Sequence, residues 1–283
     1  VSQGLVLPLS ILPNGTPAIL GADVTDALGI KKYDPEAQQE AQLLTKQPQK
    51  PQSAIARFLM RFKWYRKLFM KPKRKGGFPD WIVKTDETRI QNLTTLFEME
   101  RNKGTKFSVT EKVDGQSATY YLRKVSKRKY EFGVCSRNIY LGTPDNSSYW
   151  TIAKKYNIEN VLRQLIGYYE TIVLQGEICG NQIQGNKYHI SGYDLFAFNL
   201  IYPDHKCGTA EIKKLLEPYG IKTVPIVEED KTLPGTIAEL VEYSKGKSVV
   251  RKEQKREGVV MRNVQSNISF KVINPDFLLA EKD

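Results

Sequence analysis

The sequence predicts an α+β protein, and two observations lead to this prediction. From about Pro79 onward, short apolar stretches rich in β-branched and aromatic residues alternate with segments whose apolar residues recur at helical spacing. Before that point the chain has only a small β-rich stretch, a polar linker and a basic segment. We therefore expect a main domain over residues 79–283, preceded by shorter pieces over residues 1–50 and 51–78.

The pieces before the main domain differ in composition. Residues 1–35 alternate short apolar runs with turns such as PNGTP, which indicates part of a small β-rich module. Residues 36–55 are polar and contain two prolines, which is typical of a linker. Residues 57–75 then interleave lysine and arginine with aromatic residues, and no acidic residue intervenes.

The basic segment 57–75 fits three structures, namely a nucleic-acid-binding face, a membrane-surface helix or a solvated docking helix. The net charge of +12 and the isoelectric point near 9.4 favour the first, because lysine and arginine that neutralise phosphates release counterions. The candidate nucleic-acid contacts in this segment are Arg66, Lys67, Lys73 and Arg74.

Composition also limits the location and the chemistry. No apolar run approaches the roughly 18 residues of a membrane span, and the start lacks a signal-peptide pattern, so we expect an intracellular protein of the cytoplasm or nucleus without a membrane partner. The three cysteines form no CxxC pair, which favours a reducing compartment and predicts no zinc site. Because only His189 and His205 are present, we expect any enzymatic chemistry to depend on lysine and carboxylates.

The elements of the main domain follow from periodicity and turn signals. Residues 85–103 are predicted to form a helix because Ile90, Leu93 and Phe97 share one face and a Thr-Asp pair can cap its start. Further helices are expected at 149–169, 209–220 and 236–246. Strands are expected at 107–113, 117–123, 131–136, 171–177, 193–201, 223–229, 257–263 and 268–274.

Residues 110–118, TEKVDGQSA, contain a lysine where two predicted strands meet. The local pattern predicts a hairpin with an Asp-Gly turn, in which Lys112 is an ordinary charge at a strand end. The alternative is that Lys112 is a nucleophile. A Lys-x-Asp-Gly match alone arises by chance in roughly a few per cent of chains of this length, so the rest of the chain has to decide.

Further motifs follow Lys112 in a defined order. They are CSRN with Arg137, LQGEICG with Glu177, YDLFAFNLI with Phe196 and Phe198, REGVVMR with Glu257, and SFKVIN with Lys271. Their order and spacing resemble those of the covalent nucleotidyltransferases, the superfamily of polynucleotide ligases and mRNA capping enzymes. This resemblance implies an ATP-grasp-like ligase adenylation domain, made of antiparallel sheets with flanking helices.

The resemblance also implies a role for each matching residue. Lys112 would take AMP from ATP as the nucleophile, within a nucleotide-binding motif completed by Asp114 and Gly115. Glu111 would meet the adenine amino group. A lysine nucleophile has to lose its proton, and neighbouring cationic groups together with a bound metal ion lower its pKa.

The remaining motifs would hold the nucleotide and the metal ion. Arg137 would contact the ribose, and Glu177 the ribose hydroxyl or the metal. Phe198 would stack on adenine, with Phe196 as the alternative. Glu257 would hold Mg2+ or Mn2+ or the water shell of that ion, and Lys271 would meet the α-phosphate. Such positioning and charge neutralisation are most of what transfer of a nucleotidyl group requires.

The sequence departs from the superfamily pattern in two places. Relatives carry two lysines in the final strand, separated by one residue, whereas Lys271 is followed by two apolar residues. The candidate substitutes for the second lysine are Lys255, Arg256 and Arg262. In addition, Asn199 stands where many relatives have aspartate, which leaves its role open.

A finer resemblance rests on KTDETRIQN, on IQGNKY after Glu177, and on VSQGLVLPLSIL with GADVTDALGIKKYDP near the start. These stretches resemble the Deinococcus-type ATP-dependent RNA ligases, which have an N-terminal OB module and seal 3′-OH/5′-phosphate nicks in duplexes. The resemblance implies ATP, nicked duplex RNA or an RNA/DNA hybrid as partners, and a monomer. An OB barrel needs more than the roughly fifty residues before the basic segment, so we expect a partial OB-like module that begins inside the barrel.

Three other functions remain open at this point. A DNA ligase and a capping guanylyltransferase share the covalent lysine chemistry, and the latter would use GTP. A non-catalytic nucleic-acid-binding module would share only the basic surface. The presence of Lys112, Glu177 and Glu257 together favours an enzyme over the third of these.

Overall fold

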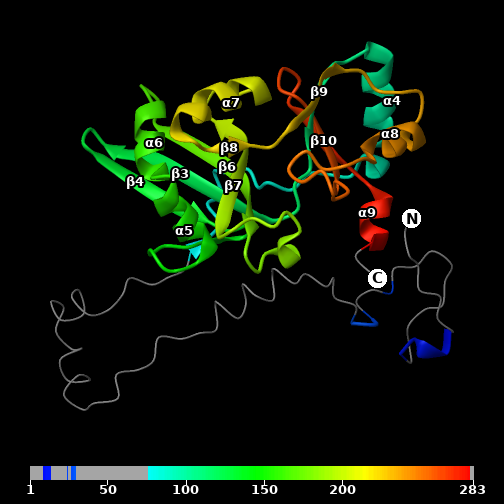
Figure 1. Ribbon diagram of the computed structural model, residues 1–283, viewed down its shortest axis with the longest axis horizontal. Helices are drawn as coiled ribbons and strands as arrows, with labels where there is room; N and C mark the ends of the chain where they lie inside the picture. The colour runs from blue at the N-terminus through cyan, green and yellow to red at the C-terminus, as the bar shows by residue number, and fades with distance from the viewer. Residues whose placement is uncertain (1–8, 14–23, 25–26, 30–75, 281–283) are drawn as a thin grey trace. The chain divides into compact units, whose positions relative to one another are not determined.

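The computed structural model describes residues 9–13, 24, 27–29 and 76–280 (Figure 1). The chain divides into two compact units, Val1–Pro51 and Gln52–Asp283. In the first unit the described part includes the short helix η1 (Leu9–Ile11). Most of the predicted OB-like module, the linker and the basic segment with Arg66, Lys67, Lys73 and Arg74 lie outside the described residues.

The second unit contains two β-sheets. The larger has seven strands in the order β1-β5-β4-β3-β6-β7-β8, and the smaller has four in the order β11-β10-β2-β9. All neighbouring strands are antiparallel except β7 and β8, which are parallel. The predicted α+β class with antiparallel sheets is confirmed.

The strand boundaries are as follows. The larger sheet contains β1 (Gly76–Gly77), β3 (Gln116–Ser126), β4 (Lys129–Cys135), β5 (Ile139–Tyr140), β6 (Thr171–Gly180), β7 (Tyr193–Ile201) and β8 (Lys222–Thr223). The smaller contains β2 (Phe107–Glu111), β9 (Ile226–Lys231), β10 (Gly258–Asn263) and β11 (Ile268–Ile273).

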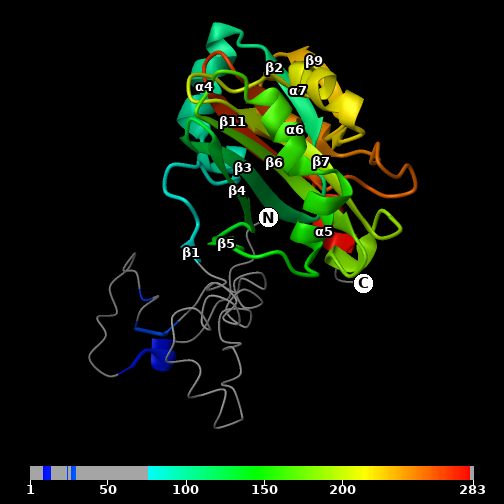
Figure 2. The ribbon, with the colours of Figure 1, turned by 90° about the vertical axis from the view of Figure 1, so that its left-hand side faces the viewer.

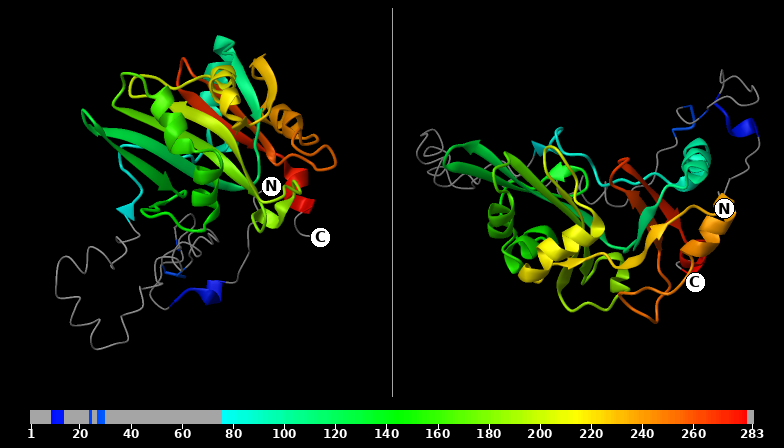
Figure 3. Two further views of the ribbon diagram at one scale, coloured as in Figure 1. Left: turned by 60° about the vertical axis from the view of Figure 1, so that its left-hand side comes forward. Right: turned by 90° about the horizontal axis from the view of Figure 1, so that it is seen from above.

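The helices cover the two sheets separately, as Figures 1 and 3 show. Residues of α5 (Ser148–Lys155), α6 (Ile158–Leu165) and α7 (Thr209–Leu216) pack into one apolar core with strands of the larger sheet. Residues of α4 (Thr94–Lys103) and α8 (Ile237–Ser244) pack into a second core with the smaller sheet. The other helices are η2 (Ile90–Asn92), η3 (Gln184–Asn186), η4 (Glu217–Tyr219) and α9 (Pro275–Ala280). None of the helices in the described part of the chain has the length and apolar character that a bilayer span requires.

Two predicted helices differ from the structure. The helix predicted over 85–103 begins at Thr94, because the segment before it pairs with β11: Arg89 bridges Lys271, and the Lys271 N–H donates to the Thr88 carbonyl at 2.9 Å. The helix predicted over 149–169 is two helices, divided at Asn157, whose φ of 46° is left-handed. Tertiary pairing and one backbone turn override the local helical pattern in these cases.

The predicted hairpin around Lys112 is wrong. The strand before this residue, β2, pairs with β10 and β9 in the smaller sheet, whereas β3 after it pairs with β4 and β6 in the larger sheet. Figure 2 shows the two strands on separate sheets. Residues 112–115 therefore carry the chain from one sheet to the other. At the end of this crossing, a Cβ on Gly115 would lie 2.4 Å from the Ile178 carbonyl oxygen, so only glycine fits.

A buried arginine ties the end of α8 to the strand entering the smaller sheet. The Arg256 guanidinium donates to the carbonyls of Tyr243, Ser244 and Lys245 at 2.7–2.8 Å, and its side chain is buried. These carbonyls have no partner within the helix, so the arginine satisfies groups that would otherwise be buried without hydrogen bonds.

We predict that Arg256→Ala lowers the free energy of unfolding by about 3 kcal/mol, because three charge-assisted hydrogen bonds are lost at a buried helix end. Denaturant unfolding followed by circular dichroism measures this change. The matched control is Lys252→Ala, an exposed cation in the same loop, which we expect to stay within about 0.5 kcal/mol of the wild type. An equal, small effect of both substitutions would contradict the capping role.

Candidate active site

The crossing segment places Lys112 beside an acidic residue of the smaller sheet. Its main-chain N–H donates to the Gly258 carbonyl at 3.0 Å, which fixes the backbone against the start of β10. Its Nζ lies 2.6 Å from Glu257 Oε2. The two side chains are 25% and 14% exposed, so this ion pair is largely shielded from water and still reachable from solvent.

The carboxylates around Lys112 control its protonation. Burial alone would lower the pKa of Lys112, but attraction to Glu257, Glu177 and Asp114 outweighs it and holds the pKa above its usual value. The amine is therefore an ammonium ion when no ligand is present. A cation bound to these carboxylates would reverse the balance and release the proton.

Further cations gather around the same point. Lys271 lies on β11 and pairs with Val260 of β10. Burial, together with repulsion from Lys112 and Arg89, lowers the pKa of Lys271. Such a group of mutually repelling cations is suited to a polyanion, since phosphate oxygens would relieve their repulsion.

Glu111 is buried next to the nucleophile candidate and has a free acceptor. Its Oε2 accepts a hydrogen bond from the Val249 N–H at 2.7 Å, while its Oε1 makes no hydrogen bond within the described residues. Burial raises the pKa of Glu111, and its side chain is 1% exposed. A buried carboxyl oxygen without a partner suits a ligand that donates hydrogen bonds, such as an exocyclic amino group.

The Asp114 position is held by a loop that the sequence interpretation did not assign to the site. Asp114 Oδ2 lies 2.6 Å from Lys187 Nζ, and the Asp114 N–H donates to the Tyr188 hydroxyl at 2.8 Å. Lys187 and Tyr188 are the last residues of IQGNKY, a stretch singled out by resemblance and not by chemistry. The adjacent lysine and tyrosine in that stretch are the sequence feature that could have indicated a role in the site.

The predicted ribose contacts lie on the larger sheet. Arg137, just after β4, pairs with Asp86 at 2.6 Å. Glu177, on β6, pairs in register with Ser117 of β3, whose hydroxyl is hydrogen-bonded to Thr85. The extended segment before α4 therefore reaches the same region as these two residues, which is why it does not form the predicted helix.

The two candidate stacking aromatics border the same core cluster but differ in burial. Phe196 is 5% exposed and packs in a core cluster with Val113 and Val224. Phe198 lies next to a β-bulge in the pairing of β6 and β7 and is only partly buried. The guanidinium of Arg262, on β10, lies 5.6 Å from the centre of the Phe198 ring, so this ring faces the smaller sheet.

The candidate substitutes for a second lysine have different surroundings. Arg256 is not available, because it donates to carbonyls at the end of α8. Arg262 is buried and donates to the Thr110 hydroxyl at 2.9 Å, and Lys255 is exposed. Arg89 lies directly beside Lys271 and was missed, because only the pairing of its segment with β11 brings it there.

Comparison with known proteins gives a consistent result. A family model described as RNA ligase matches residues 105–273. Solved structures of RNA ligase from Naegleria gruberi are similar over nearly the whole chain. The structure with PPi has a TM-score of 0.70 and 32% identity, covering 100% of this chain and 74% of the other. A mutant with AMP and Mn gives the same values. A mutant with ATP and Mn has a TM-score of 0.71 and 30% identity, covering 99% and 74%. No curated protein matches the chain.

We predict that Glu257→Gln lowers the pKa of Lys112, because the amide removes the strongest attraction while the burial remains. The rate at which an amine-specific reagent modifies Lys112, followed by peptide mass spectrometry across pH, should show its midpoint at a lower pH. Glu253→Gln, an exposed acid of the neighbouring loop, is the control and should leave the midpoint unchanged. A midpoint that does not move in Glu257→Gln would refute this account of the ion pair.

Proposed function

The chain belongs to the RNA ligase family and is an ATP-dependent RNA ligase that uses a divalent metal ion, and from this premise we propose that it works through a lysyl-AMP intermediate on Lys112. The observation that carries the proposal is the partly buried Lys112–Glu257 ion pair where the chain crosses between the sheets. A lysine at such a junction is held against acids of both sheets and is not an ordinary charge at the end of a hairpin.

The residues around Lys112 fit a magnesium or manganese ion. Glu257 and Glu177 present carboxylates, the oxygen donors that these ions prefer, and both attract Lys112 closely enough to raise its pKa. When bound, the ion neutralises these carboxylates and so favours the uncharged amine of Lys112. Glu257 and Glu177 are therefore the proposed metal ligands.

In the proposed first step, Lys112 Nζ loses a proton to solvent and attacks the α-phosphorus of ATP. A nitrogen–phosphorus bond forms, the bond from the α-phosphorus to the bridging oxygen breaks, and pyrophosphate leaves. Lys271, with Arg89 beside it, would neutralise the charge that develops on the α-phosphate oxygens; support comes from the clustering of these cations near Lys112. The AMP then passes to a 5′-phosphate end, and a 3′-hydroxyl finally attacks that activated phosphate and displaces AMP.

The nucleotide is proposed to be recognised by residues from both sheets. Glu111 Oε1 would accept a hydrogen bond from the adenine amino group, supported by its lack of a partner among the described residues. Phe198 is the proposed stacking residue, because its ring is only partly buried and faces β10, whereas Phe196 is buried. Arg137 and Glu177 would bind the ribose by hydrogen bonds. Asp114 and Gly115 keep the crossing segment in place, the first through Lys187 and the second through its close packing.

The proposed polynucleotide is a nicked duplex with a 3′-hydroxyl and a 5′-phosphate, either RNA or an RNA/DNA hybrid. Support comes from the motifs shared with Deinococcus-type ligases and from the net charge of +12. A partial OB-like module over residues 1–50 and the basic segment 51–78 would hold the backbone around the nick. We further propose that the protein acts as an intracellular monomer.

We predict that α-labelled ATP with magnesium or manganese transfers its label to the protein, giving an acid-labile band on a denaturing gel. Lys112→Ala and Lys112→Met should reduce labelling by at least about a thousandfold, as expected for loss of a nucleophile. Lys124→Ala, an exposed lysine on β3, is the matched control. Labelling from GTP and not ATP would identify a guanylyltransferase, and label that persists without Lys112 would rule out this lysine.

We predict that replacing Arg66, Lys67, Lys73 and Arg74 with glutamine weakens binding to nicked duplexes. The slope of log K against the logarithm of the salt concentration should become less steep by roughly 0.9 for each phosphate contact that is lost. Self-adenylylation should be unaffected. The control neutralises four exposed cations around the β3–β4 turn, Lys124, Lys127, Arg128 and Lys129. Equal loss of binding and adenylylation would contradict a role confined to the nucleic acid.

Sealing assays with RNA or DNA on the 3′-hydroxyl side then separate an RNA ligase from a DNA ligase.

A further inference from the structure

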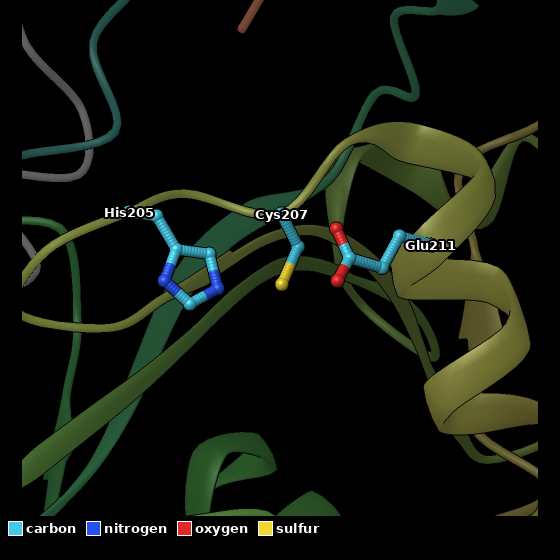
Figure 4. A group of neighbouring side chains, drawn as sticks. All are labelled: His205, Cys207 and Glu211. Atoms are coloured by element: carbon cyan, nitrogen blue, oxygen red, sulfur yellow. The ribbon is translucent and has the colours of Figure 1, made fainter. Parts of the chain in front are cut away.

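Three potential metal ligands of different chemistry meet where β7 leads into α7. They are an imidazole, a thiol and a carboxylate, from His205, Cys207 and Glu211. One ligand atom from each lies within 4.8 Å of the other two, and Figure 4 shows the three side chains directed toward one another. None of these residues belongs to the proposed Lys112 site.

The backbone holds this group in a defined turn. The Tyr202 N–H donates to the His205 carbonyl at 2.8 Å, and the Cys207 N–H donates to the Leu200 carbonyl at 2.9 Å, which folds the connection back onto the end of β7. Glu211 lies in the first turn of α7, where one carboxylate oxygen accepts from the Gly208 N–H at 3.3 Å. The three ligands are therefore attached to a strand end and a helix start.

The imidazole is already oriented for binding a metal ion. Its Nδ1 lies 2.7 Å from Asp204 Oδ1, which leaves Nε2 as the nitrogen that can bind. Its ring also stacks on Tyr202, with ring centres 4.8 Å apart and planes 16° apart. A carboxylate often accepts a hydrogen bond from the Nδ1–H of a zinc-bound histidine. This hydrogen bond fixes the tautomer and makes the imidazole a stronger ligand.

We propose that His205, Cys207 and Glu211 bind a zinc ion, with water in the fourth position. Nitrogen, sulfur and carboxylate oxygen are the ligands that zinc prefers, whereas magnesium and manganese prefer oxygen alone. Cys207 is buried, while His205 and Glu211 are exposed, so an ion can enter from solvent. On binding, a zinc–sulfur bond replaces the thiol proton, which passes to solvent. The ion would link the β7–α7 turn to α7.

The three residues were not predicted to form a site, because the sequence was judged by pairs of cysteines. Cys207 has no cysteine near it in the sequence, and its ligand partners lie two residues before and four residues after it. That spacing is meaningful only once the turn before α7 and the first turn of the helix are known. The expectation of no zinc site rested on the absence of a CxxC pair alone.

The test uses the full-length chain, stripped with a chelator and titrated with Co2+, a spectroscopic substitute for zinc. We expect the wild type to show a thiolate-to-cobalt absorption band that saturates as one Co2+ binds at Cys207 and that Zn2+ then removes, whatever Co2+ binds the carboxylates near Lys112. Cys207→Ser should lose the band. Cys135→Ser, which alters another buried free cysteine, should retain it. Oxygen-only binding at the carboxylates near Lys112 cannot produce this band.

Further substitutions test the geometry without disturbing the core. Glu211→Gln and His205→Gln change exposed side chains and should each weaken zinc affinity by at least tenfold, while Asp204→Asn should weaken it by 10- to 100-fold through the imidazole. Thermal melting confirms that each variant is folded. The proposal is overturned if the wild type shows no thiolate band, or if the band survives the loss of Cys207 or of both exposed ligands.

Discussion

The passage of the chain from the smaller to the larger sheet at residues 112–115 is the constraint on which the rest of the site depends. Because β2 and β3 lie in different sheets, Lys112 is placed at their junction. The crossing is close enough that Gly115 packs against the Ile178 carbonyl without room for a side chain. Acids from both sheets, Glu257 and Glu177, then surround one lysine. A hairpin with the same sequence would have left that lysine at the rim of a single sheet.

The charges at this junction balance one another. Lys112 is held as an ammonium ion by the surrounding carboxylates, and Lys271 and Arg89 add positive charge nearby. The cluster is therefore suited to bind a metal ion and a polyphosphate together. The metal ion neutralises the carboxylates, and the phosphate groups neutralise the lysine and arginine cations. Solved structures similar to this chain contain Mn with ATP, which agrees with that combination.

The two sheets have different roles in the arrangement. The smaller sheet contributes Glu111, Glu257 and Lys271, at or next to β2, β10 and β11, while the larger contributes Glu177 and Phe198. Each sheet has its own apolar core and its own covering helices, so each can hold its share of the site rigidly. The proposed site thus depends on both cores and on the short segment that joins them.

The sequence by itself predicted the α+β class, most of the strands and the candidate site residues, because alternation of apolar side chains and linear spacing are local properties. It missed β1 and β5, and it joined β8 and β9, which lie in different sheets, into one strand. Only the tertiary structure decided which strands pair. It replaced the expected hairpin at Lys112 with a crossing, moved the start of α4 to Thr94 and brought Arg89 beside Lys271. It also turned Phe198 toward the smaller sheet and gathered three ligands around the β7–α7 turn. These outcomes depend on burying side chains far apart in the chain, and no local pattern contains that information.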